Sequence, residues 1–172
     1  MTDAPPAIRT LLAELDYELS NTRKTLIRIP AEQLDWLPHP RSMSFRGLAT
    51  HLVNLLEWGA ITLTKDVFDL APPGVAAPRA TAIASATEAL ELFDRRAVAL
   101  RDALAAATDA SLAAPWTLLA GGRPVFTMPR GVVFRRMVMY HSAHHRGQLT
   151  VYLRLMEAPL PALYGPSADE TA

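Results

Sequence analysis

The sequence contains no cysteine among its 172 residues, and this absence removes several kinds of chemistry. A disulfide framework, a thiolate metal site and a cysteine nucleophile are all excluded. A metal ion would therefore have to be bound by histidine or carboxylate side chains. Any reaction that uses a thiol would likewise need a thiol that the substrate carries.

The sequence also has no excess of charge and no long hydrophobic run. Seventeen Lys and Arg residues balance seventeen Asp and Glu residues, which disfavours non-specific binding to nucleic acid. No apolar run reaches the roughly 18 residues that a membrane span needs. Residues 1–6 lack the basic and apolar regions of a signal peptide. We therefore expect a cytoplasmic protein that binds neither nucleic acid nor membranes.

Four long segments show the apolar spacing of amphipathic helices, separated by stretches rich in proline and glycine. They are expected at about residues 5–30, 44–71, 81–108 and 130–156. Thr2 and Asp3 are candidate caps for the first helix, and Ser44 for the second. Gly147 interrupts the last helix at a cost of about 1 kcal/mol relative to alanine, for which close approach of another helix is the expected reason. The length fits a single domain, residues 1–172, with a flexible tail at about 167–172.

Signals for β-strands are weak. Residues 123–128 follow Gly121 and Gly122 and form the one candidate, but Pro124 argues against a strand, so we assign them to a loop. The fold class is then all-α, a four-helix bundle with antiparallel or mixed helices. The stretch 71–80 is longer than a tight connection needs, so the second and third helices could run parallel across a crossover.

The histidines are the most informative residues because four of the five belong to two of the predicted helices: His51, His141, His144 and His145. Residues four apart stack on one side of a helix, so His141 and His145 can converge, whereas His144 is rotated from His145 by about 100°. His51 lies on an apolar face, where an unpaired imidazole costs about 1–3 kcal/mol. That cost would be offset if the three imidazoles bound a metal ion, which would keep open coordination positions for water or substrate. Histidines that satisfy one another in a metal-free core are the competing interpretation.

Two familiar metal motifs are missing. A zincin needs glutamate directly after the first histidine, and Ser142 occupies that position, so metalloprotease activity is disfavoured. A carboxylate-bridged di-iron bundle needs Glu-x-x-His motifs on two helices, and the sequence has no such pair. A centre with one metal ion fits the residues better.

Two segments of the sequence resemble the DinB superfamily, which includes YfiT-like metal-dependent hydrolases. They are residues 42–52, which contain His51, and the His-x-x-His-His-Arg-Gly-Gln segment within residues 141–149. The ending, residues 153–159 and 164–170, is also similar. The resemblance covers most of the chain, and the histidine-rich segment is its most specific part.

The resemblance implies a four-helix bundle with up-down-down-up topology and often a homodimer. It also implies a divalent metal, Zn, Ni or Fe, held by His51, His141 and His145. Some similar proteins are thiol S-transferases or thiol-dependent isomerases that use bacillithiol, mycothiol or glutathione. A low-molecular-weight thiol is therefore a candidate co-substrate.

The resulting interpretation is a metal-dependent enzyme that activates a thiol or water for attack on a small-molecule electrophile, as a thiol S-transferase or a hydrolase. Candidate helpers are His144 and Tyr140 as proton carriers, Gln148 one turn beyond the last histidine, and Arg146 for an anionic group. The competing role for Arg146 is that of a solvated or ion-paired helix residue. The alternative function is a non-catalytic, metal-stabilised dimer that acts as a binding or stress-response module.

Overall fold

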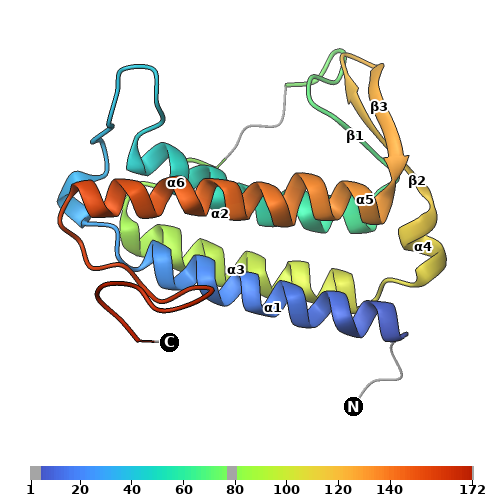
Figure 1. The fold of residues 1–172 in the computed structure, drawn as a ribbon. Coiled ribbons are helices and arrows are strands. Elements are labelled where there is room, and N and C mark those ends of the chain that lie inside the picture. The colour runs from blue at the N-terminus through green and yellow to red at the C-terminus, as the bar shows by residue number, and fades with distance from the viewer. Residues whose placement is uncertain (1–4, 77–80, 172) are drawn as a thin grey trace.

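The computed structural model describes residues 5–76 and 81–171, and most of these residues are helical. Four long helices lie side by side (Figure 1): α1 (Pro6–Leu26), α2 (Phe45–Thr64), α3 (Ala86–Ala105) and α6 (Tyr140–Leu155). The shorter helical elements are η1 (Ala31–Gln33), α4 (Asp109–Ala113), α5 (Arg130–Phe134) and η2 (Arg135–Met139), of which η2 is a π-helix. No described helix combines the length and the hydropathy that a membrane span requires.

The long helices share one hydrophobic core. Helix α3 packs against α1 and α2, and α6 packs against the same two helices. In Figure 1, α2 and α3 run in one direction, and α1 and α6 run in the other. The apolar stripes predicted for α1 and α3 are the ones that face this core, with members such as Ile8, Leu11, Phe93 and Leu100 at 0–1% exposure.

Capping residues set the helix boundaries. Ser44 caps α2 as predicted, because its Oγ accepts a hydrogen bond from the Gly47 N–H at 3.1 Å. Helix α3 begins at Ala86 rather than near residue 81, since Ser85 caps it by accepting from the Glu88 N–H at 3.0 Å. The candidate caps Thr2 and Asp3, and residues 77–80 of the expected crossover, lie outside the described residues.

The purely all-α prediction is wrong at one end of the helices, where Figure 1 shows a small sheet beyond α5. Its strands are β1 (Val67–Asp69), β2 (Pro115–Ala120) and β3 (Arg123–Pro129), in the order β1-β2-β3. Strand β2 is parallel to β1 and antiparallel to β3. The segment 123–128 is therefore a strand and not a loop.

The β2–β3 hairpin forms despite Pro124 because β3 is the edge strand, where a missing N–H has little cost. Gly121 and Gly122 have φ angles of 63° and 76°, the left-handed values that a two-residue hairpin turn requires. The Asp69 carboxylate accepts hydrogen bonds from both glycine N–H groups, at 3.0 and 2.7 Å. The side chain that ends β1 thus holds the hairpin turn.

At the end of the molecule that carries the sheet, one buried arginine connects α2 and α4. Arg130, at 4% exposure, donates hydrogen bonds to the carbonyl oxygens of Thr62 and Lys65 at the end of α2, and to that of Ser111 in α4. It also forms an ion pair with Asp66. The positive charge therefore lies where the carbonyl end of the α2 dipole favours it.

The segment that follows α6 folds back over α1 (Figure 1). Tyr17 of α1 donates a hydrogen bond to the Leu163 carbonyl at 2.6 Å. In the expected tail, Asp169 pairs with Arg154 at 2.6 Å and Glu170 pairs with Arg28.

Two glycines within long helices differ in their surroundings. A Cβ at Gly59 of α2 would lie 2.7 Å from Leu100 Cδ1 and 3.1 Å from Val138 Cγ1, whereas one at Gly147 of α6 would meet nothing within 4 Å. The expectation of close helix approach at Gly147 is therefore wrong. The close approach occurs at Gly59, where α2 meets α3 and η2.

We expect Gly147→Ala to raise the free energy of unfolding by about 0.5–1 kcal/mol, because alanine is the better helix former and has space. Gly59→Ala should lower the free energy of unfolding, since the cost of crowding, about 1–3 kcal/mol, outweighs the gain in helix propensity. Chemical denaturation of the two variants and the parent measures both effects. An equal gain at both positions would contradict the close contact at Gly59.

Candidate metal centre

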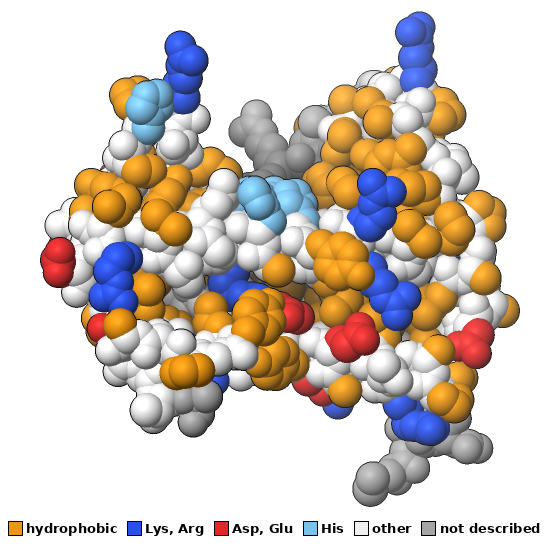
Figure 2. Space-filling model, viewed as in Figure 1, with side chains coloured by type: hydrophobic (Ala, Val, Ile, Leu, Met, Phe, Trp, Pro, Cys, Tyr) orange, Lys and Arg blue, Asp and Glu red, His pale blue; other side chains and the backbone are white. Residues whose placement is uncertain are grey.

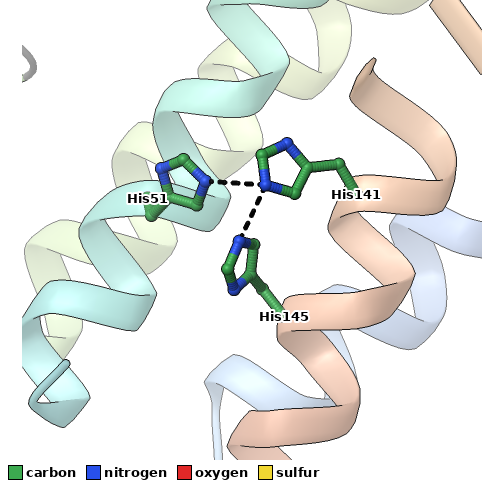
Figure 3. Close-up of side chains that lie close together, drawn as sticks. All are labelled: His51, His141 and His145. Carbon is green, nitrogen blue, oxygen red and sulfur yellow. Dashed lines mark hydrogen bonds between the residues drawn. The ribbon is translucent and has the colours of Figure 1, made fainter. Parts of the chain in front are cut away.

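Three imidazoles meet between α2 and α6 (Figure 3). His51 comes from the middle of α2, and His141 and His145 lie one turn apart near the start of α6. The Nε2 atom of His141 lies 3.3 Å from that of His51 and 2.8 Å from that of His145. Their rings, each half-buried, turn toward one point, as Figure 3 shows. The structure thus brings together the three histidines singled out in the sequence.

The spacing of these nitrogens suits a metal ion. Zinc bound tetrahedrally at about 2.0–2.1 Å holds its nitrogen ligands about 3.3–3.4 Å apart. The distance of 3.3 Å between the Nε2 atoms of His51 and His141 matches that value. The distance of 2.8 Å between the Nε2 atoms of His141 and His145 is shorter, and a small rotation of the His145 ring would lengthen it. One candidate ligand atom from each histidine lies within 4.8 Å of the others. In the described part of the chain no carboxylate joins this group, so three protein ligands would leave coordination positions open.

Gln148 orients His145. The Nδ1–H group of His145 donates a hydrogen bond to Gln148 Oε1 at 2.7 Å. With the proton on Nδ1, the Nε2 lone pair of His145 points to the shared centre, as a metal ligand requires. Gln148 was expected to be a helper, and its contact gives it an orienting role.

Burial and neighbouring imidazoles favour the neutral forms of His51 and His145. Burial first, and then the neighbouring His145 and His141, together lower the pKa of His51 to about 4. Burial is also the main cause of the lowered pKa of His145. Since neutral imidazole is the form that binds metals, the group is ready for a cation at neutral pH.

The π-helix η2 directly precedes this site and was not predicted. An i→i+5 turn contains one more residue than an α-helical turn, so the faces of α6 are shifted by about 100° from those of α5. Val133 is buried in α5, but five residues on, within the π-helix, it is Val138 rather than Met137 that is buried. The apolar face of the single helix expected at about residues 130–156 is therefore not continuous. The spacing of the apolar residues in η2 does not indicate the extra residue of the π-helical turn.

The other proton-carrier candidates lie on the exposed side of α6. His144 is exposed and, as predicted, does not join the converging nitrogens, although its ring centroid is 4.9 Å from that of His145. Tyr140 is 61% exposed. His39, in the loop before α2, contacts the Arg41 N–H through its Nδ1 at 3.1 Å.

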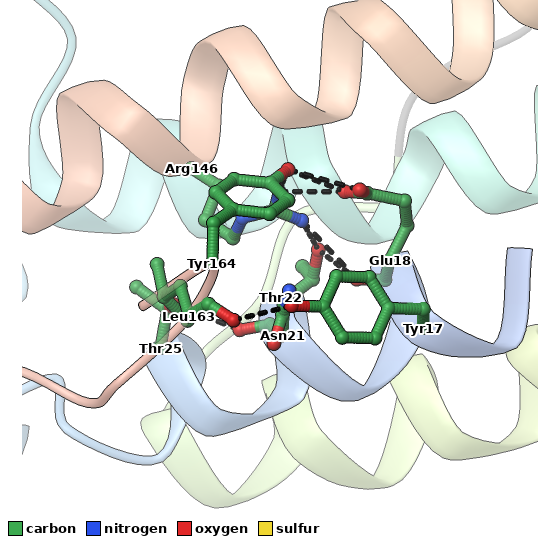
Figure 4. Close-up of polar contacts among 8 residues, drawn as sticks. All are labelled: Tyr17, Glu18, Asn21, Thr22, Thr25, Arg146, Leu163 and Tyr164. Carbon is green, nitrogen blue, oxygen red and sulfur yellow. Dashed lines mark hydrogen bonds and ion pairs between the residues drawn. The ribbon is translucent and has the colours of Figure 1, made fainter. Parts of the chain in front are cut away.

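Arg146 faces α1 instead of the histidine group (Figure 4). It is 1% exposed, pairs with Glu18 at 2.6 Å and donates to Thr22 Oγ1 at 2.9 Å. The Tyr164 hydroxyl completes the network: it donates a hydrogen bond to Glu18 and accepts one from Arg146. The ion-pair interpretation of Arg146 is thus confirmed, and its guanidinium has no free surface for a substrate anion.

The sequence model of the DinB superfamily matches residues 14–149, which include all three histidines. The chain belongs to the DinB superfamily. Its fold is similar to that of the DinB-like protein YjoA from Bacillus subtilis, with a TM-score of 0.67 at 17% identity over 88% of this chain and 95% of that one. A DinB-like protein from Bacillus cereus ATCC 10987 gives a TM-score of 0.64 at 23% identity over 87% and 92%. These two likenesses show the shared fold.

A shorter match links the chain to YrdA of Bacillus subtilis strain 168, described as uncharacterized. The two sequences are 40% identical over 45 residues, which is 26% of each protein. The match thus spans about a quarter of the length of YrdA.

We expect the metal-free protein to lose stability as the pH falls from about 6.5 toward about 4. The pKa of His51 is about 4 in the folded chain and about 6.5 in an unfolded one, so in this window only the unfolded chain binds the proton. The limit for one proton is about 1.4 kcal/mol per pH unit, and solvent screening at the half-buried ring makes the expected slope smaller. Denaturant titrations of chelator-treated protein at about pH 7 and about pH 5 measure it. The slope should be reduced in His51→Ala, and an unchanged slope would contradict the assignment.

Proposed function

We propose that this protein binds a divalent cation through His51, His141 and His145 and uses it to activate a thiol or water for attack on a small-molecule electrophile. The observation that carries the proposal is the convergence of three Nε2 atoms from two helices. Membership of the DinB superfamily supports it, because that family is associated with metals. Zn, Ni and Fe all suit three imidazole ligands.

The position of the histidines supports access by a small molecule. In Figure 2, histidine side chains lie at the floor of a dip between two raised ends of the molecule. In Figure 1 these ends are the loop between α1 and α2 on one side and the sheet on the other. A metal held there would have solvent on its open side, which favours a catalytic over a closed structural site.

When bound, the cation would supply Lewis acidity that lowers the pKa of a coordinated thiol or water. Side chains of the protein would orient the metal ligands and transfer protons. Gln148 fixes the tautomer of His145, and the exposed His144, whose ring centroid lies 4.9 Å from that of His145, is proposed to carry the proton that the nucleophile loses. A thiol nucleophile would be a low-molecular-weight co-substrate, since the chain has no cysteine.

We also propose that the long helices form the up-down-down-up four-helix bundle that the resemblance implies, and that two chains form a homodimer. The pairwise packing of the helices and their directions in Figure 1 support the topology. Apolar side chains exposed on α6, Val151 at 58% and Leu155 at 55%, offer surface for a second copy.

Replacing a proposed ligand should remove the metal. We expect protein purified without an affinity tag to hold about one ion per chain, and His51→Ala and His145→Ala to retain less than about a tenth of it. Gln148→Ala should weaken metal binding by about 10–100-fold, because the ring of His145 loses its orienting partner. Elemental analysis and competition with a chelator measure these effects.

His39→Ala and His144→Ala are the matched controls, since each removes an imidazole outside the converging group. Both should keep the metal content of the parent. Stoichiometric metal in His51→Ala or His145→Ala would contradict the three-histidine site.

Catalysis should depend on the metal and on an added thiol or water. A panel of low-molecular-weight thiols, offered with a haloarene or a bimane electrophile, should give turnover with at least one thiol. That turnover should be lost on chelation and restored by the metal. Hydrolysis without any thiol would identify water as the nucleophile. Full metal occupancy without any turnover would favour the non-catalytic binding module.

A further inference from the structure

A cavity of about 430 Å³ lies between α1, α6 and the segment that follows α6, on the α1 side of the last helix. In Figure 2, acidic and hydrophobic side chains surround a hollow below the central histidines. The cavity volume is in the range of small-molecule sites. The side chains that define its chemistry are Glu14, Tyr17, Glu18, Met139, Tyr140 and Tyr164.

Three tyrosine rings from three different parts of the chain form walls of this cavity. Tyr17 belongs to α1, Tyr140 to α6 and Tyr164 to the segment beyond it. The rings of Tyr17 and Tyr164 have centroids 6.0 Å apart and planes tilted by 46°, so they form two sides of a partial cage. Aromatic faces arranged in this way attract organic cations, quaternary ammonium ions above all.

The charge of the lining also favours a cation. Among the described residues no lysine or arginine lines the cavity, and the nearby Arg146, whose Cζ lies 5.3 Å from the centroid of the Tyr164 ring, is paired with Glu18. The charge of Glu18 is offset by Arg146 behind it, and Glu18 accepts a hydrogen bond from Tyr164 at 2.9 Å. Burial is the main cause of the raised pKa of Tyr164, so its hydroxyl stays neutral. Glu14 has no ion pair or hydrogen bond among the described residues, which leaves one uncompensated negative charge.

We propose that this cavity binds a small organic ammonium ion, with the charge near Glu14 and the alkyl groups against the tyrosine rings. A neutral ligand would leave the Glu14 carboxylate unmatched, and an anion would be repelled by it. The site is separate from the histidine group, and its occupancy requires no metal.

The test is a titration of the full-length protein with tetramethylammonium and choline, followed by NMR chemical shifts. We expect saturable changes for both ions. The neutral isostere of choline, 3,3-dimethylbutan-1-ol, should bind at least about tenfold more weakly, because it keeps the shape and loses the charge.

Variants locate the binding. Glu14→Gln and Tyr17→Leu should each weaken choline binding by about fivefold or more. Tyr17→Phe, which keeps the ring and loses the hydrogen bond to Leu163, and Glu91→Gln, an exposed acid on α3, should bind within about twofold of the parent. The NMR spectrum of each variant reports whether it is folded.

Three results would overturn the proposal: no saturable shift with either ammonium ion, equal binding of the neutral isostere, or unchanged binding by folded Glu14→Gln. His51→Ala separates this site from the proposed metal centre. That variant should bind choline like the parent even if it has lost its metal, and loss of choline binding in it would place the ion elsewhere.

Discussion

The packing of α2 against α6 is the constraint on which the histidine group depends. One imidazole from α2 meets two from α6 because the two helices share a core and lie in direct contact. At Gly59 the missing side chain allows α2 to approach α3 and η2 closely. Burial, and then the nearness of His145 and His141, lower the pKa of His51 to about 4 and so disfavour its protonation. Helix packing therefore stabilises an arrangement that the side chains alone would not adopt, and the same arrangement suits a cation.

Neighbouring residues of α6 contact two different helices. His145 faces α2, whereas Arg146, about 100° further round, faces α1. The ion pair of the buried Arg146 with the partly buried Glu18 fixes the second surface, the one that faces α1, because loss of Glu18 would leave the buried guanidinium uncompensated. The π-helix η2 sets the rotation of α6 relative to α5, and so decides which residues each surface receives.

Much of this arrangement could be predicted from the sequence because it follows helical periodicity. The stripes of α1 and α3, the Ser44 cap and the approach of His141 to His145 are local consequences of spacing along a helix. The features that could not be predicted depend on tertiary context. Pro124 is tolerated only because β3 is an edge strand. The π-helix leaves no mark in its apolar residues, and the close approach at Gly59 requires knowledge of which helices are neighbours. The meeting of His51 with the other two was an inference from resemblance and chemistry, and the contact between α2 and α6 makes it geometrically possible.

The two proposed cation sites lie on opposite sides of one helix, and electrostatics indicates that they can fill independently. A helix with its side chains is roughly 10 Å across, which is about one Debye length at physiological ionic strength. Two unit charges at that separation repel by about 1.7 kcal/mol at the effective dielectric constant of about 20 that applies near a protein surface, before screening by salt. A divalent ion doubles this figure and salt reduces it again over one Debye length, so it remains smaller than the free energy of even millimolar binding, about 4 kcal/mol. The ion pair between Arg146 and Glu18 has no net charge and so adds little to the repulsion. The last helix can therefore present a metal site to α2 and an organic-cation site to α1 without one excluding the other.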